Sequence, residues 1–126
     1  MAQAQMRRAI ESGVPDNQQY LHPLLKKNYG NWKYHDRPRP GVLHHVAHGG
    51  DEVWTVRAGT QRQMDVFTIR RLCDIADQYA EGHVRFTIRS NIEFMLSSEA
   101  KVAPLIAELE KHGFPVGGTG NSVSMI

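Results

Sequence analysis

The chain has 126 residues, of which 40% are hydrophobic and 22% are charged, so it is long enough for one domain and too apolar to be disordered throughout. Its net charge of +2 is too small to predict a nucleic-acid partner, and it has no run of about 18 apolar residues that would predict a membrane span. Its single cysteine, Cys73, excludes an internal disulfide and cannot alone hold an iron–sulfur cluster.

Residues 1–42 predict an amino-terminal arm followed by an ordered loop. Residues 1–19 are polar and lack the apolar run of a secretory signal, so we expect a cytoplasmic location. Residues 20–42 mix four aromatic side chains with prolines and glycines, which disfavours regular structure but favours packing on a surface. Within them, the prolines predict an extended backbone over residues 37–40.

Residues 43–126 predict one α+β unit. Residues 52–58 are typical of a strand. Residues 65–80 predict a helix with Asp65 as its N-cap and Gly82 at its end. Six apolar residues roughly follow helical spacing, and we expect the core face of the helix, with Cys73 on it, to come from them: Phe67, Ile69, Leu72, Cys73, Ala76 and Tyr79.

Residues 83–96 alternate strictly between apolar and polar side chains. The apolar residues carry even numbers: Val84, Phe86, Ile88, Ile92, Phe94 and Leu96. The polar residues carry odd numbers: Arg85, Thr87, Arg89, Asn91 and Glu93. This pattern predicts one core face and one polar face, on one long strand or on two strands joined near residues 90–91.

A second helix is expected over residues 98–112, beginning close to Pro104 and ending at Gly113. Its predicted buried stripe consists of Val102, Leu105, Ile106 and Leu109. The order strand, helix, strand predicts a right-handed βαβ unit with parallel strands, and hence an α+β or α/β class. Because the chain stops at apolar Ile126 with no partner strand to follow, we expect it to be a fragment.

Three odd-numbered side chains predict an anion site. Arg85, Thr87 and Arg89 would form a donor-only face on one strand, and Arg57 would join them if its strand lies in the same sheet. Such a face suits a ligand rich in anionic oxygen, whereas an ordinary solvated strand face is the alternative. The segment Gly117-Gly118-Thr119-Gly120 allows close backbone approach to an anion or a flat cofactor, with an ordinary turn as its alternative.

The histidines His44, His45 and His48 are expected to be structural or surface residues, not metal ligands. Gly41 and Gly49 bracket them too closely for the helix that would align His44 with His48. We therefore predict no metal site in this chain.

Several segments resemble the sirohaem nitrite and sulfite reductases. They are residues 53–57 (VWTVR), 85–94 (RFTIRSNIEF) and 117–120 (GGTG). Residues 27–35 (KNYGNWKYH) and 40–43 (PGVL) are similar to the beta subunits of the dissimilatory sulfite reductases within that family. The resemblance covers roughly residues 20–126.

The resemblance implies a ferredoxin-like half-domain of a larger subunit in an α₂β₂ assembly with a related alpha subunit. It implies sirohaem coupled to a [4Fe-4S] cluster, six-electron interconversion of sulfite and sulfide-level sulfur, and a small sulfur-carrier protein as a further partner. The cluster ligands would lie outside this sequence, and the isolated fragment is expected to be inactive.

By motif, Arg89 would approach the substrate on the open haem face. Arg85 and Thr87 would bind sirohaem carboxylates or line the pocket, and Asn91 belongs to the same motif. Arg57 and Gly117, Gly118, Thr119 and Gly120 would contact or flank the macrocycle. Many sirohaem enzymes follow the glycine segment with an arginine–asparagine pair, where this chain has Ser124 and Met125.

Two other functions are alternatives to this one. An RNA-binding module would carry aromatic and arginine side chains on one sheet face, but Phe86 and Phe94 have the opposite parity to the arginines. A non-catalytic half-domain that docks on a partner protein is the other alternative, and the aromatic arm would suit it.

Overall fold

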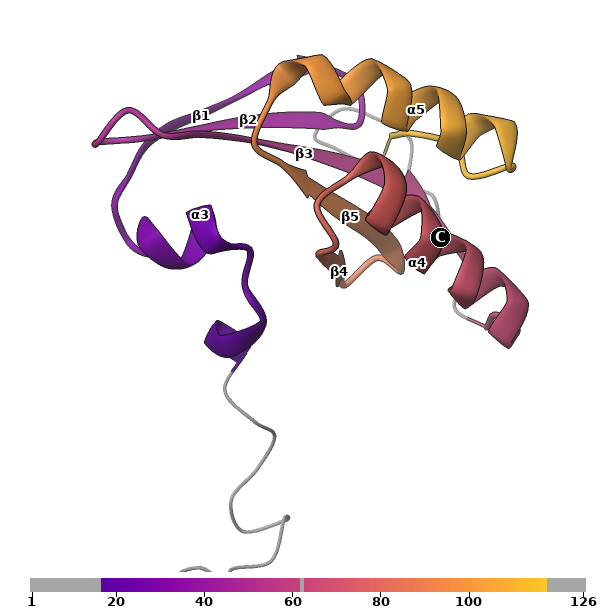
Figure 1. Ribbon diagram of the computed structural model, residues 1–126. Coiled ribbons are helices and arrows are strands. Elements are labelled where there is room, and N and C mark those ends of the chain that lie inside the picture. Colours follow the sequence, from indigo (N-terminus) through magenta and orange to yellow (C-terminus); the bar gives the residue numbers. More distant parts are fainter. Residues whose placement is uncertain (1–16, 62, 118–126) are drawn as a thin grey trace, which may run out of the picture.

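The computed structural model describes residues 17–61 and 63–117. In this part of the chain, five strands form one sheet in the order β1-β2-β3-β5-β4, and each strand is antiparallel to its neighbours (Figure 1). In chain order the elements are η1 (Asn17–Tyr20), α3 (Pro23–Lys27), β1 (Trp32–Arg39), β2 (Val42–Ala47), β3 (Glu52–Gly59), α4 (Val66–Tyr79), β4 (Val84–Phe86), β5 (Asn91–Leu96), η2 (Glu99–Lys101) and α5 (Val102–Lys111).

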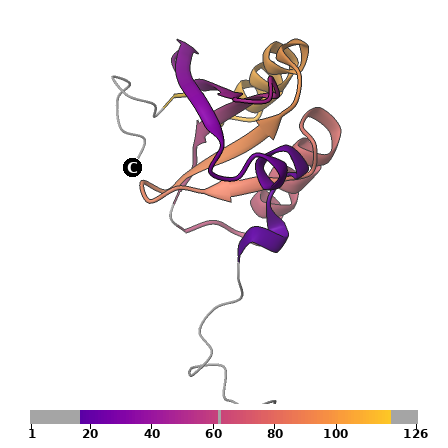
Figure 2. The same ribbon diagram turned by 90° about the vertical axis from the view of Figure 1, so that its left-hand side faces the viewer.

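Helices α4 and α5 cover one face of the sheet, and α3 lies on the other side (Figures 1 and 2). Val56 and Phe94 are cross-strand partners on the helix-covered face, and both are fully buried in the core. The predicted stripe of α5 is buried there as well: Val102, Leu105, Ile106 and Leu109. Side chains alternate between the two faces along each strand, so the residues next to these core residues in the sequence point to the opposite face. We call this opposite face the open face.

The helix boundaries follow the expected capping chemistry. Asp65 precedes α4, and its carboxylate accepts a hydrogen bond from the backbone N–H of Thr68 at 2.8 Å. Gly82 lies just beyond α4 with φ of +78°, and Gly113 lies just beyond α5 with φ of +84°. Both conformations favour glycine, so both predicted helix ends are confirmed.

The two strands joined by helix α4 run in the same direction, as predicted, but another strand lies between them. β3 and β4 both pair antiparallel with β5, so they run in the same direction with β5 between them. The predicted parallel direction of these two strands is therefore confirmed, but they are not neighbours, because the helix returns the chain one strand further along the sheet. On the other side of β3, Ala58 forms a bridge with Val116. Helices packed on one antiparallel sheet confirm the α+β class.

The alternating segment is a hairpin of two strands, which was one of the two alternatives. The backbone N–H of Thr87 donates to the carbonyl of Asn91 at 2.8 Å, and that of Ser90 donates to the carbonyl of Thr87 at 3.1 Å. Ser90 adopts φ of +64°, the left-handed residue that closes a three-residue hairpin loop. The partners Val84 with Phe94 and Arg85 with Glu93 keep odd and even side chains on separate faces.

The even-numbered residues of this hairpin are buried on β5 only. Ile92, Phe94 and Leu96 are buried, whereas Phe86 is 59% exposed and Ile88 fully exposed. The prediction of one continuous core face is wrong for β4, because this short strand is the edge of the sheet.

Residues 20–42 contain more regular structure than predicted. Residues 32–39 form β1, which includes Pro38, and β1 is the other edge strand, where proline removes no necessary hydrogen bond. The extended backbone predicted for residues 37–40 is confirmed for residues 37–39, whereas Pro40 lies in the turn before β2. The aromatic side chains Tyr20, Tyr29 and Tyr34 are largely exposed, contrary to expectation. β2 begins at Val42, and the division of the chain at residues 42 and 43 stays a prediction.

Three residues of the α4 pattern do not reach the core. Cys73 is exposed, as are Phe67 and Ile69, whereas Leu72 and Ala76 are buried. At about 100° per residue, Cys73 lies on the flank of the stripe and Phe67 lies nearly opposite Leu72. The prediction of a core cysteine is wrong for this reason. Among the described helices, α4 is the longest with 14 residues, and none has the length and apolar character to span a bilayer.

The arm is fastened to the half-domain through Glu81. Its Oε1 accepts a hydrogen bond from Nε2 of His22 at 2.6 Å, while Nδ1 of His22 accepts from the backbone N–H of Leu24. Its Oε2 accepts from the backbone N–H and hydroxyl of Ser97 and from Nζ of Lys101 at 2.7–2.9 Å. One carboxylate therefore joins the arm to the segment that follows β5.

We expect Glu81→Gln to lower the free energy of unfolding by about 1–2 kcal/mol at neutral pH. Burial raises the pKa of Glu81, but hydrogen bonds from Lys101, Ser97 and His22 outweigh it and hold the pKa near 2, against an ordinary 4.5. Because the folded pKa is depressed, the stabilisation is present above pH 4.5 and is lost as the pH falls toward 2. Urea unfolding at several pH values should show a weaker acid dependence in the variant.

The control for this prediction is Glu110→Gln, a charge-neutralising change on the exposed side of α5. We expect it to leave both the stability and its acid dependence close to those of the wild type. Equal effects of the two variants would show that Glu81 does not fasten the arm.

Candidate functional site

Three charged side chains lie in a row across the open face, one from each of β3, β5 and β4. Glu93 Oε1 accepts from Nη2 of Arg57 at 2.9 Å. Glu93 Oε2 accepts from Nη2 and Nε of Arg85 at 2.6 and 3.1 Å. We call Arg57, Glu93 and Arg85 the charged row.

The strand register produces this row. Arg57 and Arg85 are the cross-strand partners of Glu93 on its two sides, so all three side chains leave the sheet in the same direction. Glu93 is only 3% exposed, whereas the Arg85 side chain is 61% exposed. The expected donor-only face is therefore wrong, since a buried carboxylate lies between the guanidinium groups. Glu93 has an odd number, as the arginines do, and this was the available sequence signal for its position. Knowledge of which strands pair would have revealed its role.

On a single strand, Thr87 and Arg89 would share a face with Arg85 and extend the charged row. They do not extend it. Both lie in the turn between β4 and β5, where the chain reverses. The hydroxyl of Thr87 accepts a hydrogen bond from the backbone N–H of Asn91 at 3.1 Å and so supports the turn. Arg89 is half-buried beside it and makes contacts of its own. The structure thus brings Arg57 and Arg85 together and places Arg89 at the end of the hairpin.

Asn91 lies two residues before Glu93 on the same strand and has no exposed surface. Neither its amide nitrogen nor its amide oxygen makes a hydrogen bond within the described part of the chain. A buried amide without partners costs roughly 1–3 kcal/mol, so this position favours a further polar group beside it.

The glycine-rich segment starts next to Arg57. The backbone N–H of Gly117 donates to the carbonyl of Arg57 at 2.9 Å. A Cβ at Gly41 would overlap the side chain of Val116 and would lie 2.6 Å from the backbone nitrogen of Gly117. Glycine at position 41, with φ of +82°, therefore permits this close approach. The other predicted residues, Gly118, Thr119 and Gly120, lie outside the described residues.

A cavity of about 450 Å³ lies on the open face. The charged row contributes Arg85 and Glu93 to its wall, and the arm contributes Tyr20, Leu21 and Leu25. Its remaining lining residues are Trp32, His35, Leu43, His45, Thr55, Val84 and Met95. Cationic, apolar and imidazole groups thus face one space.

Two histidines of this cavity are hydrogen-bonded to each other. Nδ1 of His35 lies 2.6 Å from Nδ1 of His45, and Nε2 of His45 lies 3.2 Å from the hydroxyl of Thr55. Burial, reinforced by the neighbouring His35, lowers the pKa of His45 from 6.5 to about 4. The sequence pattern did not single out this pair, because residues 32–39 were not predicted to form a strand beside β2.

His44 points to the other face of the same strand. Its ring stacks on Trp54 with centroids 4.7 Å apart, and its two nitrogens lie 3.2 Å and 3.1 Å from carboxylate oxygens of Asp36 and Glu52. Across residues 17–61 and 63–117, no group of three histidine, cysteine or acidic side chains is arranged to hold a metal ion.

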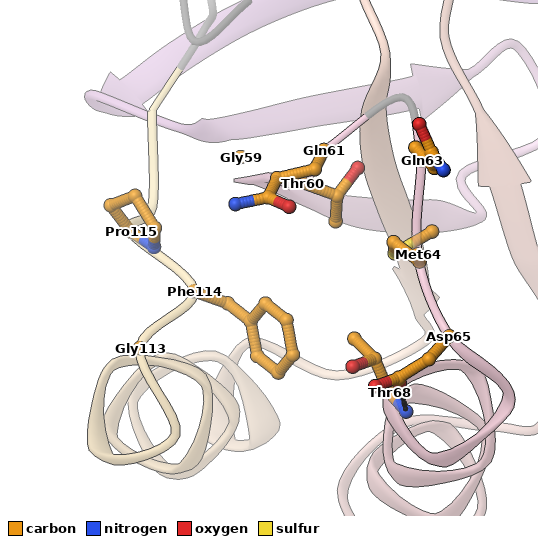
Figure 3. A pocket seen from close by; sticks show the side chains of 10 residues that line it. All are labelled: Gly59, Thr60, Gln61, Gln63, Met64, Asp65, Thr68, Gly113, Phe114 and Pro115. Atoms are coloured by element: carbon orange, nitrogen blue, oxygen red, sulfur yellow. Dashed lines mark hydrogen bonds between the residues drawn. The ribbon is translucent and has the colours of Figure 1, made fainter.

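A second cavity, of about 520 Å³, lies between the start of α4 and the end of α5 (Figure 3). Gln61, Gln63, Thr68 and Phe114 line it. Its acidic residue, Asp65, is already engaged as the helix cap. It offers no cation, so it suits an anionic ligand less well than the cavity on the open face.

Residues 45–112 match the family model described as the nitrite/sulfite reductase ferredoxin-like half domain. The curated relatives include three proteins named "Sulfite reductase, dissimilatory-type subunit beta". The protein of Archaeoglobus fulgidus is 48% identical over 112 residues, which are 88% of this chain and 31% of the relative.

The protein of Nitratidesulfovibrio vulgaris is 44% identical, with 94% of this chain and 33% of the relative covered. That of Megalodesulfovibrio gigas is 45% identical, with 86% of this chain and 44% of the relative covered. The chain therefore spans less than half the length of each of these relatives. Because the matched family region includes β3, α4, β4, β5 and α5, with the whole charged row, the chain belongs to the family of nitrite/sulfite reductase ferredoxin-like half domains.

Proposed function

We propose that this chain is part of a beta subunit of dissimilatory sulfite reductase and that its open face helps to bind sirohaem and the sulfite oxyanion. The observation that carries the proposal is the charged row, which lies beside a cavity in the family's half-domain. The names of three relatives at 44–48% identity support the same reaction class.

The residues on the open face fit sirohaem, which carries many carboxylates. Two guanidinium groups share one carboxylate in the charged row, so the row keeps a net positive charge. Arg85 is exposed enough to donate further hydrogen bonds, and charge-assisted bonds from arginine suit carboxylates. The buried amide of Asn91 adds a donor and an acceptor that have no partner in the described part of the chain.

When bound, sirohaem with its [4Fe-4S] cluster would supply the electrons that reduce the sulfur. This chain has one cysteine, exposed on α4, so the cluster ligands must come from outside it. The part played by these residues is to bind anionic groups and fix their orientation.

Within this proposal, Arg57 and Arg85 hold anionic groups against the sheet, and Arg89 acts on sulfite. Glu93 fixes the two arginines of the row, so their charge is oriented before any ligand arrives. Reduction places negative charge on the oxygens that leave sulfur, and fixed cations stabilise that charge most strongly where water is excluded. Thr87 supports the turn that carries Arg89, and residues 117–120 would flank the ligand.

The proposed assembly is α₂β₂ with a related alpha subunit, in the cytoplasm, with sulfite as substrate and a small sulfur-carrier protein as a further partner. A second function rests on a specific surface, the edge strand β4. Phe86 and the neighbouring Ile88 are exposed there, which suits a non-catalytic half-domain that docks on another protein. The full-length subunit, assembled with its partner, distinguishes the two functions: sirohaem absorbance and sulfite turnover support the enzyme.

We expect Arg85→Gln, made in the assembled full-length subunit, to weaken sirohaem retention by about tenfold or more. The change removes the charge from the most exposed member of the charged row while it keeps a polar side chain. Sirohaem absorbance per subunit after dialysis measures the effect. Arg70→Gln, on the exposed side of α4, is the matched control and should retain the cofactor. Equal retention in the two variants would exclude Arg85 from the sirohaem site.

For Arg89→Ala, we expect sirohaem absorbance to be retained while sulfite turnover falls by roughly a hundredfold or more, because a cation directed at developing charge acts mainly in the transition state. Steady-state kinetics with a reduced electron donor measures the turnover, and Arg70→Ala again serves as the control. Turnover unchanged from the wild type would remove Arg89 from the site.

A further inference from the structure

A continuous file of hydrogen bonds runs along the wall of the cavity on the open face, from an exposed side chain to a buried one. It runs from exposed His35 to half-buried His45 over 2.6 Å, and from His45 to buried Thr55 over 3.2 Å. Thr55 is 7% exposed and lines the same cavity as Arg85 and Glu93. His35 and His45 line this cavity as well, so the file runs along the cavity wall from exposed His35 on the edge strand to buried Thr55 beside the charged row.

The sheet register holds this file in place. His35 on β1 is the cross-strand partner of His45 on β2, and both rings contact Trp32, with centroids about 6 Å apart. On β3, Thr55 lies two residues before Arg57, so the hydroxyl and the guanidinium leave the same face of one strand. Strand pairing, not a flexible loop, sets the two distances.

His45 has the protonation state that a relay requires. A neutral imidazole has one nitrogen that donates and one that accepts, so it can take a proton on one side and release one on the other. Burial, together with His35, lowers its pKa to about 4, while Glu93 and Asp36 raise it and His44 lowers it by smaller amounts. His45 is therefore neutral near pH 7.

We propose that His35, His45 and Thr55 form a proton-transfer chain along the cavity wall, from exposed His35 to buried Thr55 beside the charged row. Nε2 of His35 takes a proton from water, and its Nδ1–H passes to Nδ1 of His45. Nε2–H of His45 then passes to the hydroxyl of Thr55, which releases its own proton into the cavity. No electrons move in these steps, and the starting tautomers return when the groups rotate and exchange protons with water.

This chain rests on the proposed function, because sulfite reduction consumes protons. Each oxygen that leaves the sulfur leaves as water and must be protonated on the way. Arginines cannot supply these protons, since they do not lose their charge near neutral pH. A supply of protons beside the charged row is therefore a chemical requirement of the reaction, and the file of hydrogen bonds offers a route for them.

The test uses the full-length subunit in its assembly. We expect Thr55→Val and His45→Gln each to lower kcat for sulfite by about tenfold or more, with KM changed less than about twofold. Thr55→Ser, which restores the hydroxyl, should recover most of the turnover lost in Thr55→Val. The solvent deuterium isotope effect on kcat should rise in both relay variants, and added imidazole should partly restore His45→Gln.

The control is His48→Gln, an exposed histidine just after β2, which should match the wild type in kcat and isotope effect. Equal kcat in Thr55→Val and Thr55→Ser would overturn the proposal. The proposal would also be overturned if Thr55→Val lost its sirohaem absorbance and no buffer restored it. The hydroxyl would then act structurally.

A second measurement does not depend on enzyme activity. Histidine-selective ¹⁵N NMR of the chain should detect a scalar coupling across the hydrogen bond between Nδ1 of His35 and Nδ1 of His45. The Nε2 signal of His45 should shift in Thr55→Val and stay in place in His48→Gln. Absence of the coupling would refute the relay, whereas a wild-type assembly without sirohaem or sulfite turnover would refute the proposed function instead.

Discussion

A buried carboxylate held between two guanidinium groups organises the open face of this domain. Glu93 is almost fully buried, and a buried charge is tolerated only when it is paired and hydrogen-bonded. Arg57 and Arg85 meet that need from opposite sides, with three N–H donors at 2.6 to 3.1 Å. Because each partner comes from a different strand, this interaction also fixes the register of β3, β5 and β4.

The position of the cavity follows from this row and from the arm. Helices α4 and α5 take up the apolar side of the sheet, so the polar side is left for other contacts (Figure 2). The arm crosses that side and is fastened by His22 to Glu81, which places Tyr20 and Leu25 at the cavity wall. The paired histidines reach the same cavity from β1 and β2. Charged, imidazole and apolar side chains thus line one cavity, and they come from several strands and the arm.

The sequence predicted the local elements well and the long-range pairings poorly. Asp65 and Gly82 mark the ends of α4 through chemistry that acts over a few residues, so the pattern alone located them. The reversal at Ser90 was harder, because polar and apolar residues keep their alternation through the turn. As a result, Arg89 was placed on a strand face that it does not occupy.

The candidate site was predicted in part for the same reason. Arg57 and Arg85 were expected to share a face, and they do, since parity is a local property of each strand. The role of Glu93 depends on which strands are neighbours, and the pairing of His35 with His45 depends on an edge strand that contains a proline, which argued against a strand there. Neither relation can be read from spacing along the chain.

The most direct test of the central claim is a double-mutant cycle on Arg57 and Glu93. Free energies of unfolding would be measured by denaturant titration for the wild type, Arg57→Gln, Glu93→Gln and the double variant. If the buried carboxylate depends on the guanidinium, the coupling energy will be about 2 kcal/mol or more. A coupling below about 0.3 kcal/mol, as found for independent residues, would contradict the account.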